Sequence, residues 1–409
     1  MPRAYHATLI GVPPPVHTMD ALGTKSRPGV VIWASKEDAS ELHAALKALK
    51  WLEPLSTSQK KNRDMVGFVC QHTSPLDEDQ IQRLESWFPH HFEHGITTVE
   101  PAGLSVNPHQ KLRYAVSQWL ALQPFQYDGD LLERLPSKWE RLGDLVVLSS
   151  GAFTDPKWCA MLERVPPEQT VGLWSQVASA LGGLRLARQD HIANNDMRTP
   201  QLELLHGTST WVEFTDYGVH FGFDAKKVMF SSGNITERHR IGGLSMKGET
   251  VVDAYAGAGY YTLPMLVRSG AEHVHACEMN PASIEGLTWA AMANGVEHKL
   301  TVHAGNNQTT LQDLKGIADR CHLGLLPSSE AVWVHAIRCL KPSGGWLHIH
   351  MNINKKEIDA LSMETQELLQ RYAREEGRDW RVTVEHIERV KSFSPGVMHV
   401  VFDVMCSGA

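Results

Sequence analysis

The chain has 409 residues and a formal net charge of −7, with 42% hydrophobic and 21% charged residues. This composition is typical of a globular protein with two or three domains. The acidic balance argues against a protein that coats nucleic acid nonspecifically, and no apolar run approaches the roughly 20 residues that a membrane span requires. The six cysteines lack CxxC spacing, so they indicate neither a zinc site nor a disulfide framework.

The N-terminal part predicts a poorly ordered leader over residues 1–28, followed by an α+β domain over residues 29–127. The leader lacks the apolar segment of a signal peptide, so we expect a cytoplasmic protein. Short apolar runs predict the strands of the domain, and apolar residues at helical spacing predict its helices. The expected strands are residues 30–33 and 65–70, and the expected helices are residues 36–49, 77–87 and 110–122.

The middle of the chain predicts a second α+β domain over residues 128–235. Two apolar strands flank a turn at Tyr217, which predicts a hairpin over residues 210–223. Asn234 precedes a helical pattern and Glu237 follows three residues later, which predicts a capped helix start. The other expected elements are an apolar strand at the end of residues 135–148, a helix at 167–181 and a strand at 202–205.

Residues 236–409 alternate between strand and helix patterns, which predicts a catalytic α/β domain with a Rossmann-like sheet. We expect seven strands, the last of them antiparallel. The expected strands are residues 250–253, 273–277, 300–303, 322–325, 346–350, 380–390 and 399–406, and the expected helices are residues 281–294, 329–340 and 356–376.

Residues 251–259 (VVDAYAGAG) predict a buried strand that ends in a glycine turn, and Glu278 ends the next strand. Gly257 and Gly259 let the backbone approach a ligand, and an acid at the tip of the second strand can accept hydrogen bonds from a ribose diol. The dinucleotide pattern G-x-G-x-x-G is not met, and Asp253 stands before the turn instead. The pattern is similar to that of S-adenosylmethionine enzymes of the class I methyltransferase fold.

The third strand of this domain ends in residues 304–307 (AGNN), a loop that lies beside adenine in this fold. Asn306 and Asn307 are suited to contact the adenine edge, although a plain surface turn fits the spacing equally well. After the fourth strand, residues 324–329 (GLLPSS) lack the N/D-P-P-Y/F motif of many base-modifying N-methyltransferases. This absence argues against an ordinary amino methyltransferase.

With these motifs, the chain resembles the tRNA wybutosine-synthesising protein 2 family, aminocarboxypropyltransferases related to the tRNA guanine-37 N1-methyltransferases. The resemblance covers roughly residues 130–352, and the N-terminal domain is less diagnostic. It rests on residues 136–145 (PSKWERLGDL), 198–200 (RTP), 204–207 (LLHG), 229–238 (MFSSGNITER), 253–259 (DAYAGAG), 276–281 (ACEMNP), 294–296 (NGV), 323–329 (LGLLPSS) and 348–352 (HIHMN).

The resemblance implies transfer of the 3-amino-3-carboxypropyl group of S-adenosylmethionine, a co-substrate, to the 4-demethylwyosine base at position 37 of phenylalanine tRNA. 5′-Methylthioadenosine would be released. The sulfonium activates all three attached carbons, so orientation of the acceptor would select the product and carry most of the catalysis. No dedicated general base is obviously required.

The resemblance also implies which residues bind the cofactor. Glu278 would accept from the ribose hydroxyls, and Asn306 and Asn307 would contact adenine. Ser231 and Arg238 would hold the amino-acid end, since a guanidinium can form paired hydrogen bonds to a carboxylate. The family usually has Asp at position 306 and Lys at position 238, so this chain departs from it twice. Without the resemblance, Arg238 would be interpreted as a charge on a helix surface.

His348 and His350 alternate along the fifth strand and should face the same side of the sheet. Two histidines are too few for a convincing metal site, and the histidines of residues 88–94 (PHHFEH) stand beside a proline that indicates a turn. We therefore expect no metal, and His350 is a secondary candidate near the substrate. Two alternatives stay open: a tRNA guanine-37 N1-methyltransferase, and a non-catalytic RNA-binding protein with a decayed cofactor pocket, which Asn306 would favour.

Overall fold

The computed structural model describes residues 27–53, 58–61, 64–72, 74–99, 107–189, 200–230 and 232–408. Nearly all of the expected leader lies outside these residues. The chain divides into two compact units, Met1–Gln110 and Lys111–Ala409. Among the described residues, the helices are too short or too polar to cross a membrane.

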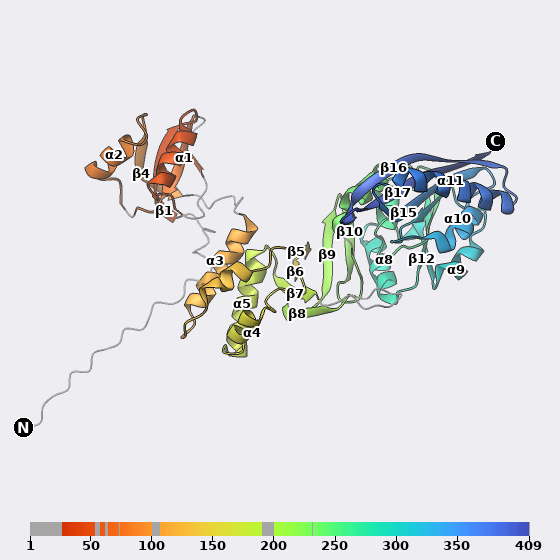
Figure 1. Ribbon diagram of the computed structural model, residues 1–409, viewed down its shortest axis with the longest axis horizontal. Helices are drawn as coiled ribbons and strands as arrows, with labels where there is room; N and C mark the ends of the chain where they lie inside the picture. Colours follow the sequence, from red (N-terminus) through yellow and green to blue (C-terminus); the bar gives the residue numbers. More distant parts are fainter. Residues whose placement is uncertain are drawn as a thin grey trace, which may run out of the picture. The chain divides into compact units, whose positions relative to one another are not determined.

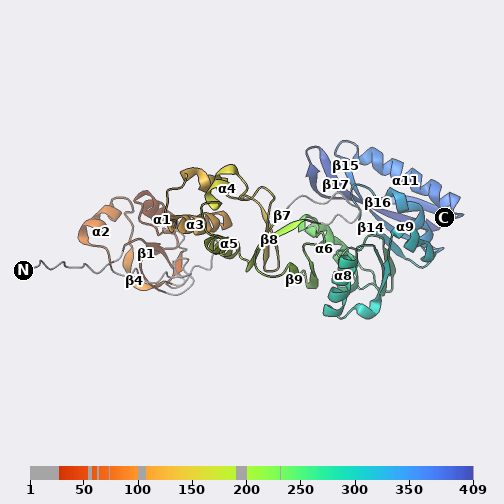
Figure 2. The same ribbon diagram turned by 90° about the horizontal axis from the view of Figure 1, so that it is seen from below.

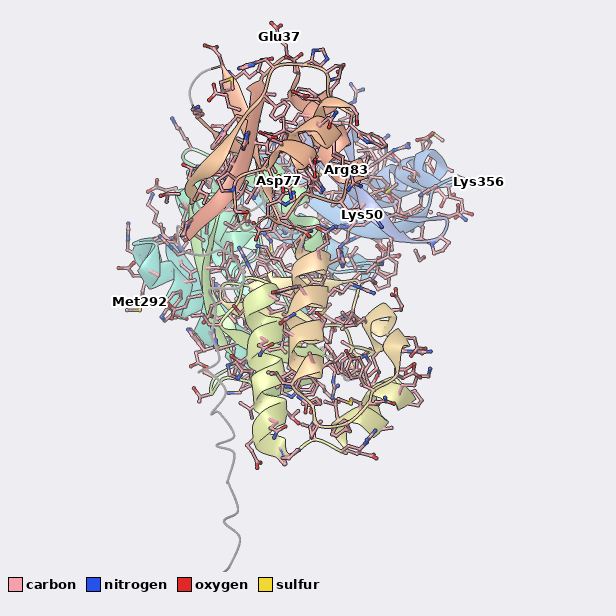
Figure 3. The ribbon with its side chains drawn as sticks, turned by 90° about the vertical axis from the view of Figure 1, so that its left-hand side faces the viewer. Glu37, Lys50, Asp77, Arg83, Met292 and Lys356 are labelled. Atoms are coloured by element: carbon pink, nitrogen blue, oxygen red, sulfur yellow. The ribbon has the colours of Figure 1, made fainter. Side chains whose placement is uncertain are left out.

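The first unit contains an antiparallel sheet with the strand order β2-β3-β1-β4. Asp77, labelled in Figure 3, starts the second helix by accepting a hydrogen bond from the backbone N–H of Gln80. The edge strand β4 was not predicted, because its polar sequence EHGITTV gives only a weak strand signal. The elements are β1 Arg27–Ser35, α1 Ala39–Ala48, β2 Gln59–Lys60, β3 Met65–Cys70, α2 Glu78–Glu85 and β4 Glu93–Val99.

The first part of the second unit is a four-stranded sheet, β5-β6-β7-β8, covered by helices. Its core centres on Phe153, whose ring lies 4.8 Å from that of Trp158 and 5.1 Å from that of Trp174. Residues 135–148 form two strands rather than one. The elements are α3 Pro108–Ala121, η2 Gly129–Arg134, β5 Trp139–Leu142, β6 Leu145–Leu148, α4 Pro156–Leu162, α5 Pro167–Ala180, β7 Arg185–Gln189 and β8 Leu202–His206.

The expected hairpin is confirmed as β9 Trp211–Asp216 paired with β10 Val219–Asp224. Tyr217 and Gly218 both have positive φ, 50° and 79°, which is the backbone of a type I′ turn and matches the twist of the two strands. The hairpin packs against the helix that follows β12, and a Cβ at Gly222 would lie 2.4 Å from the ring of Trp289.

Asn234 is the N-cap residue of the next helix, as predicted, but the predicted capping hydrogen bonds do not form. A short 3₁₀ turn, η3 Ser232–Asn234, leads into α6 Ile235–Gly243, and the Asn234 side chain makes no capping hydrogen bond. Glu237 instead pairs with Arg240 at 2.7 Å inside the protein. Glu237 of the expected capping box is therefore directed to another partner, whereas the buried Oδ1 of Asn234 has no hydrogen-bond partner among the described residues.

The seven-stranded sheet with the order β13-β12-β11-β14-β15-β17-β16 confirms the class I methyltransferase fold, with β17 antiparallel to both of its neighbours. The first five strands are parallel. Their bounds are β11 Thr250–Asp253, β12 His273–Glu278, β13 Leu300–Ala304, β14 Arg320–Leu323, β15 Gly344–Asn354, β16 Trp380–Ser394 and β17 Val397–Gly408.

Helices cover both faces of this sheet. Figure 1 shows α10 beside α11, and Figures 1 and 2 both show α8 on the opposite side of the sheet from α11. Alternate residues of β11 explain this arrangement, because Val252 belongs to the apolar cluster with α10 and α11 and Val251 to the one with α6 and α7. The remaining elements are α7 Thr262–Val267, α8 Pro281–Ala293, η4 Glu297–Lys299, α9 Asn307–Thr310, η5 Leu311–Asp313, η6 Glu330–Val332, α10 Trp333–Cys339 and α11 Ile358–Glu375.

Candidate cofactor site

A cavity of about 590 Å³ opens at the carboxyl ends of β11, β12 and β14. Ligands bind at this edge in open α/β sheets, because the loops there leave a crevice. The structure brings four of the expected site residues to this cavity, namely Gly257, Glu278, Asn306 and Asn307. Further lining residues include Met229, Tyr255, Met279, Leu325 and Val332, which the sequence reasoning missed although they stand close to the motifs.

The glycine turn follows β11 and has the backbone that only glycine adopts freely. Gly257 and Gly259 have φ values of 55° and 87°. A Cβ at Gly259 would lie 2.6 Å from the side chain of Leu263, so the close packing of the turn on α7 also requires glycine. The motif thus shapes the cavity floor, with Gly257 at its surface and Gly259 beneath.

Glu278 is held at the tip of β12 by three backbone N–H groups. Its Oε2 accepts from Gly257 at 2.8 Å, and its Oε1 accepts from Met279 at 2.9 Å and from Asn280 at 2.7 Å. Burial raises the pKa of this carboxyl, and the three hydrogen bonds oppose that rise. A carboxylate has about four lone-pair directions, so capacity remains for one further donor, chiefly at Oε2.

Asn306 and Asn307 lie at the cavity edge, and each is also engaged in local structure. The Asn306 side chain caps α9 by accepting from the Gln308 backbone N–H at 2.9 Å. Asn307 Nδ2 donates to the Ala254 carbonyl at 2.9 Å, which ties the adenine-side loop to the glycine turn. The two amides therefore position the loop, and any contact with a base would use their remaining polar atoms.

Arg238 is buried, with 3% of its surface exposed, so the interpretation as a helix-surface charge is wrong. Its guanidinium donates to Asp216 from Nε at 2.7 Å and pairs with it from Nη2 at 2.6 Å. The charge also lies 4.5 Å from the centre of the Tyr260 ring. Arg238 is not among the cavity-lining residues, but its buried Nη1 has no partner among the described residues and could still bind an anionic group.

Asp253 is fully buried and lies outside the cavity lining. Its carboxylate accepts from the Thr262 hydroxyl at 2.8 Å and from the Tyr255 backbone N–H at 3.2 Å, so it braces the glycine turn from below. Ser231 lies outside the described residues.

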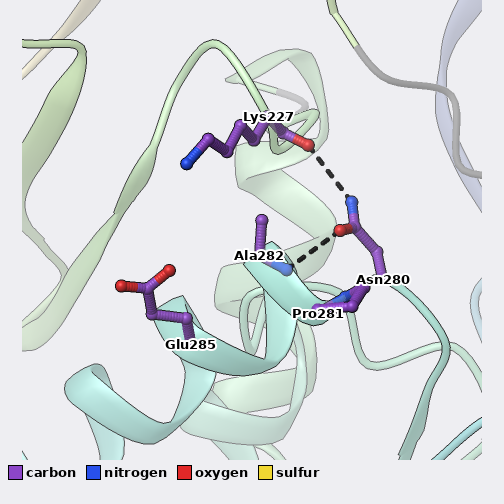
Figure 4. Close-up of a pocket in the computed structure, with 5 residues that line it drawn as sticks. All are labelled: Lys227, Asn280, Pro281, Ala282 and Glu285. Carbon is purple, nitrogen blue, oxygen red and sulfur yellow. Dashed lines mark hydrogen bonds between the residues drawn. The ribbon is translucent and has the colours of Figure 1, made fainter.

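A second cavity of about 400 Å³ adjoins the N-terminus of α8 (Figure 4). Asn280 lines both cavities. Its Nδ2 donates to the Lys227 carbonyl at 3.1 Å, and its Oδ1 accepts from the Ala282 N–H at 3.0 Å, as the dashed lines of Figure 4 show. The Asn280 side chain therefore joins the segment after β10 to α8, the helix that follows Glu278.

His348 and His350 lie on one face of β15, as predicted, and both are buried. His350 contacts two further histidines, His322 of β14 and His399 of β17. Among the residues with described positions, no group of three or more His, Cys, Asp or Glu side chains is arranged to hold a metal ion.

Comparison with known proteins identifies matches along most of the chain. A family model of the TRM5/TYW2 methyltransferase domain matches residues 212–383, and one of the TYW2 N-terminal domain matches residues 124–210. The chain is 36% identical over 395 residues to the tRNA wybutosine-synthesizing protein 2 homolog of Bos taurus, covering 85% of this chain and 84% of that protein. It is also 41% identical over 307 residues to tRNA wybutosine-synthesizing protein 2/3/4 of Arabidopsis thaliana, but spans only 30% of that longer protein.

Solved structures show the same fold. The structure of TYW2 from P. horikoshii in complex with MeSAdo superposes with a TM-score of 0.57 at 26% identity, covering 74% of this chain and 100% of that one. The structure of Trm5b from Pyrococcus abyssi superposes with a TM-score of 0.57 at 18% identity, and the match covers 93% of this chain and 99% of the Trm5b chain. At this identity the match is evidence for the fold only.

Proposed function

The chain belongs to the tRNA wybutosine-synthesising protein 2 family, and on this premise we propose that it transfers the 3-amino-3-carboxypropyl group of S-adenosylmethionine to a tRNA base. The observation that carries the proposal is the cavity at the sheet edge, where Gly257 and Glu278 meet Asn306 and Asn307. A relative's structure contains MeSAdo, the portion of S-adenosylmethionine that remains after this transfer.

In the proposed reaction, a nucleophilic atom of the base forms a bond to the carbon of the aminocarboxypropyl arm. The bond from that carbon to sulfur breaks, its electron pair stays on sulfur, and 5′-methylthioadenosine leaves. Glu278 would hold a ribose hydroxyl, and Arg238, with Ser231, would hold the amino-acid end. Holding both ends of the cofactor presents one carbon to the acceptor, and such positioning accounts for much of the rate enhancement.

For the acceptor, we propose the 4-demethylwyosine base at position 37 of phenylalanine tRNA, in a cytoplasmic setting. The match of residues 124–210 to the TYW2 N-terminal domain supports a role of the middle of the chain, proposed as residues 128–235, in contacts with the tRNA. The segment 324–329 (GLLPSS) offers no carboxamide followed by an aromatic clamp, which favours this reaction over methyl transfer.

The test is mass spectrometry of the spent cofactor after incubation with S-adenosylmethionine and precursor phenylalanine tRNA. We expect 5′-methylthioadenosine and a matching mass gain on the tRNA. S-Adenosylhomocysteine would show methyl transfer and refute the proposal. Failure to bind or consume the cofactor would also refute it and favour the decayed pocket.

The variant E278Q tests the site itself. The substitution removes the charge that would accept from the ribose hydroxyl, and a hydrogen bond to a charged group contributes about 1.5–3 kcal/mol. We expect cofactor affinity, measured by calorimetry, to fall at least about 10-fold. E285Q is the matched control, since Glu285 lines the neighbouring cavity of Figure 4 but not this one. Equal affinity of E278Q and E285Q for the cofactor would exclude Glu278 from the binding site.

A further inference from the structure

Three buried imidazoles form a continuous chain across the central strands of the sheet. His350 Nδ1 lies 3.0 Å from His399 Nε2, and His350 Nε2 lies 3.1 Å from His322 Nε2. None of the three is more than 1% exposed. Each comes from a different strand, β14, β15 or β17, so only the fold brings them together.

The chain of imidazoles runs beside the cofactor cavity. A Cβ at Gly324, which lines the cavity, would lie 3.1 Å from Cε1 of His322. At the other end, His399 pairs in register with Asn352, near the carboxyl end of β15. The Asn352 backbone N–H donates to the carbonyl of Pro327, within the segment 324–329 that follows β14. The imidazoles therefore follow the sheet edge at which the cavity opens.

The proton positions along the chain follow from counting donors. Three neutral imidazoles carry three protons, and the two contacts between them use two. The third belongs at one of the two ends, and at the His322 end the Asp253 carboxylate lies 3.7 Å from Nδ1. A negative charge favours the proton there, so His350 donates to His322 and His399 donates to His350. This leaves His399 Nδ1 as an unprotonated acceptor.

His399 Nδ1 has no hydrogen-bond partner among the described residues, although it is buried. A buried acceptor without a donor costs about 1–3 kcal/mol. His322 Nδ1, at the other end of the chain, is likewise buried without a hydrogen-bond partner among the described residues, so both ends can take part in proton transfer.

The proposed reaction needs a proton acceptor. S-Adenosylmethionine carries a positive sulfonium charge, and 5′-methylthioadenosine is neutral. When the arm replaces a hydrogen of a neutral base to give a neutral product, charge balance requires that one proton be released. If no general base took part, as the sequence led us to expect, this proton would pass to solvent water.

We propose that His399, His350 and His322 form a proton relay that accepts this proton at His399 Nδ1 and delivers positive charge toward Asp253. The inference rests on the proposed function. As the bond from hydrogen to the base breaks, directly or through one water, His399 Nδ1 takes the proton and the electron pair stays on the base. The proton on His399 Nε2 moves to His350 Nδ1, and the proton on His350 Nε2 moves to His322 Nε2.

After these steps the net charge of +1 resides on His322, whose nearest anion is Asp253. Burial lowers the pKa of His350 well below its ordinary value and that of His399 to about 4, so both are neutral near pH 7 and neither retains a positive charge. The other titratable groups around the relay are Tyr261, Glu237, Arg240, His348 and Lys391.

Nitrogen-15 NMR of histidine-labelled protein tests the proton positions without any turnover. The relay histidines are assigned by the signals that disappear in H399Q and H322N. We expect an unprotonated Nδ1 on His399 and a protonated Nδ1 on His322. The opposite arrangement, with the proton on His399 Nδ1, would overturn the proposal.

Single-turnover transfer tests the role of the relay in the reaction. In H399Q, the glutamine amide can still donate to His350 but provides no base, so we expect the rate to fall at least about 100-fold with cofactor affinity unchanged. H399N serves as a second variant in case H399Q folds poorly, and cofactor binding reports the fold of each. The matched control is H275Q, because His275 also contacts one imidazole, His303 at 3.0 Å, but lies on β12 away from the relay.

Transfer by folded H399Q within threefold of the wild-type rate would overturn the relay, as would an equal loss in H275Q. If the wild-type chain forms S-adenosylhomocysteine, the proposed function fails separately. The relay is then judged by the NMR result and by the ratio of the wild-type and H399Q rates of S-adenosylhomocysteine formation.

Discussion

Replacement of Arg238 by methionine separates its two possible roles, holding the fold and holding the cofactor. Arg238 Nε and Nη2 are occupied by Asp216, whereas the buried Nη1 has no partner among the described residues. If Nη1 binds the carboxylate of S-adenosylmethionine, R238M removes a hydrogen bond between charged groups, which contributes about 1.5–3 kcal/mol. The expected loss of affinity is about 10- to 150-fold.

The assay compares two ligands by calorimetry. 5′-Methylthioadenosine lacks the aminocarboxypropyl arm, so its affinity should change little in R238M while that of S-adenosylmethionine falls. R238K keeps the charge but not the guanidinium fork that engages Asp216, so it should recover only part of the difference. If both ligands weaken equally, or neither does, Arg238 does not contact the arm.

The variant R320M controls for loss of a buried ion pair. Arg320 is 5% exposed and pairs with Glu249 at 2.8 Å, at the start of β14 and away from the cavity-lining residues. Removal of one partner of a buried pair destabilises by about 3–5 kcal/mol. Both variants should therefore unfold at lower urea concentration, and only R238M should change the ratio of the two affinities.

Two further predictions concern stability. Replacing Gly259 by alanine adds a Cβ at φ 87° and 2.6 Å from a leucine side chain, so urea unfolding should show a loss of about 2–4 kcal/mol. G295A has a similar φ of 67° but open space around the Cβ, and it should lose only about 1 kcal/mol; equal losses would exclude the steric term. Burial lowers the pKa of His399 to about 4 and also lowers that of His350, so between pH 6.5 and 4 the unfolded chain binds protons that the folded chain does not. The free energy of unfolding should be full above pH 6.5 and fall as the pH decreases toward 4. H399Q should reduce this pH dependence, whereas H298Q, at an exposed position, should not. If the free energy of unfolding depends on pH as strongly in H399Q as in the wild type, the lowered pKa of His399 is contradicted.

Local patterns predicted the elements that depend on few neighbours. The strand β11 and the glycine turn after it are specified by a short apolar run and by two glycines at positive φ. The hairpin turn at Tyr217 and the seven strands of the catalytic domain were predicted for the same reason, because apolar periodicity reports which face of an element is buried. The start of α6 after Asn234 was predicted correctly, but its capping hydrogen bonds were not, because Glu237 pairs with Arg240 instead of the backbone at Asn234.

By itself, the sequence determined the order of the elements, the class I fold and the motif residues Gly257 and Glu278 at the end of their strands. Only the tertiary structure decided which side chains meet across the sheet. His350 and His399 are 49 positions apart, and Arg238 pairs with Asp216 22 positions away. Such contacts depend on strand order and register, which bring distant residues to one face, and no local pattern records them.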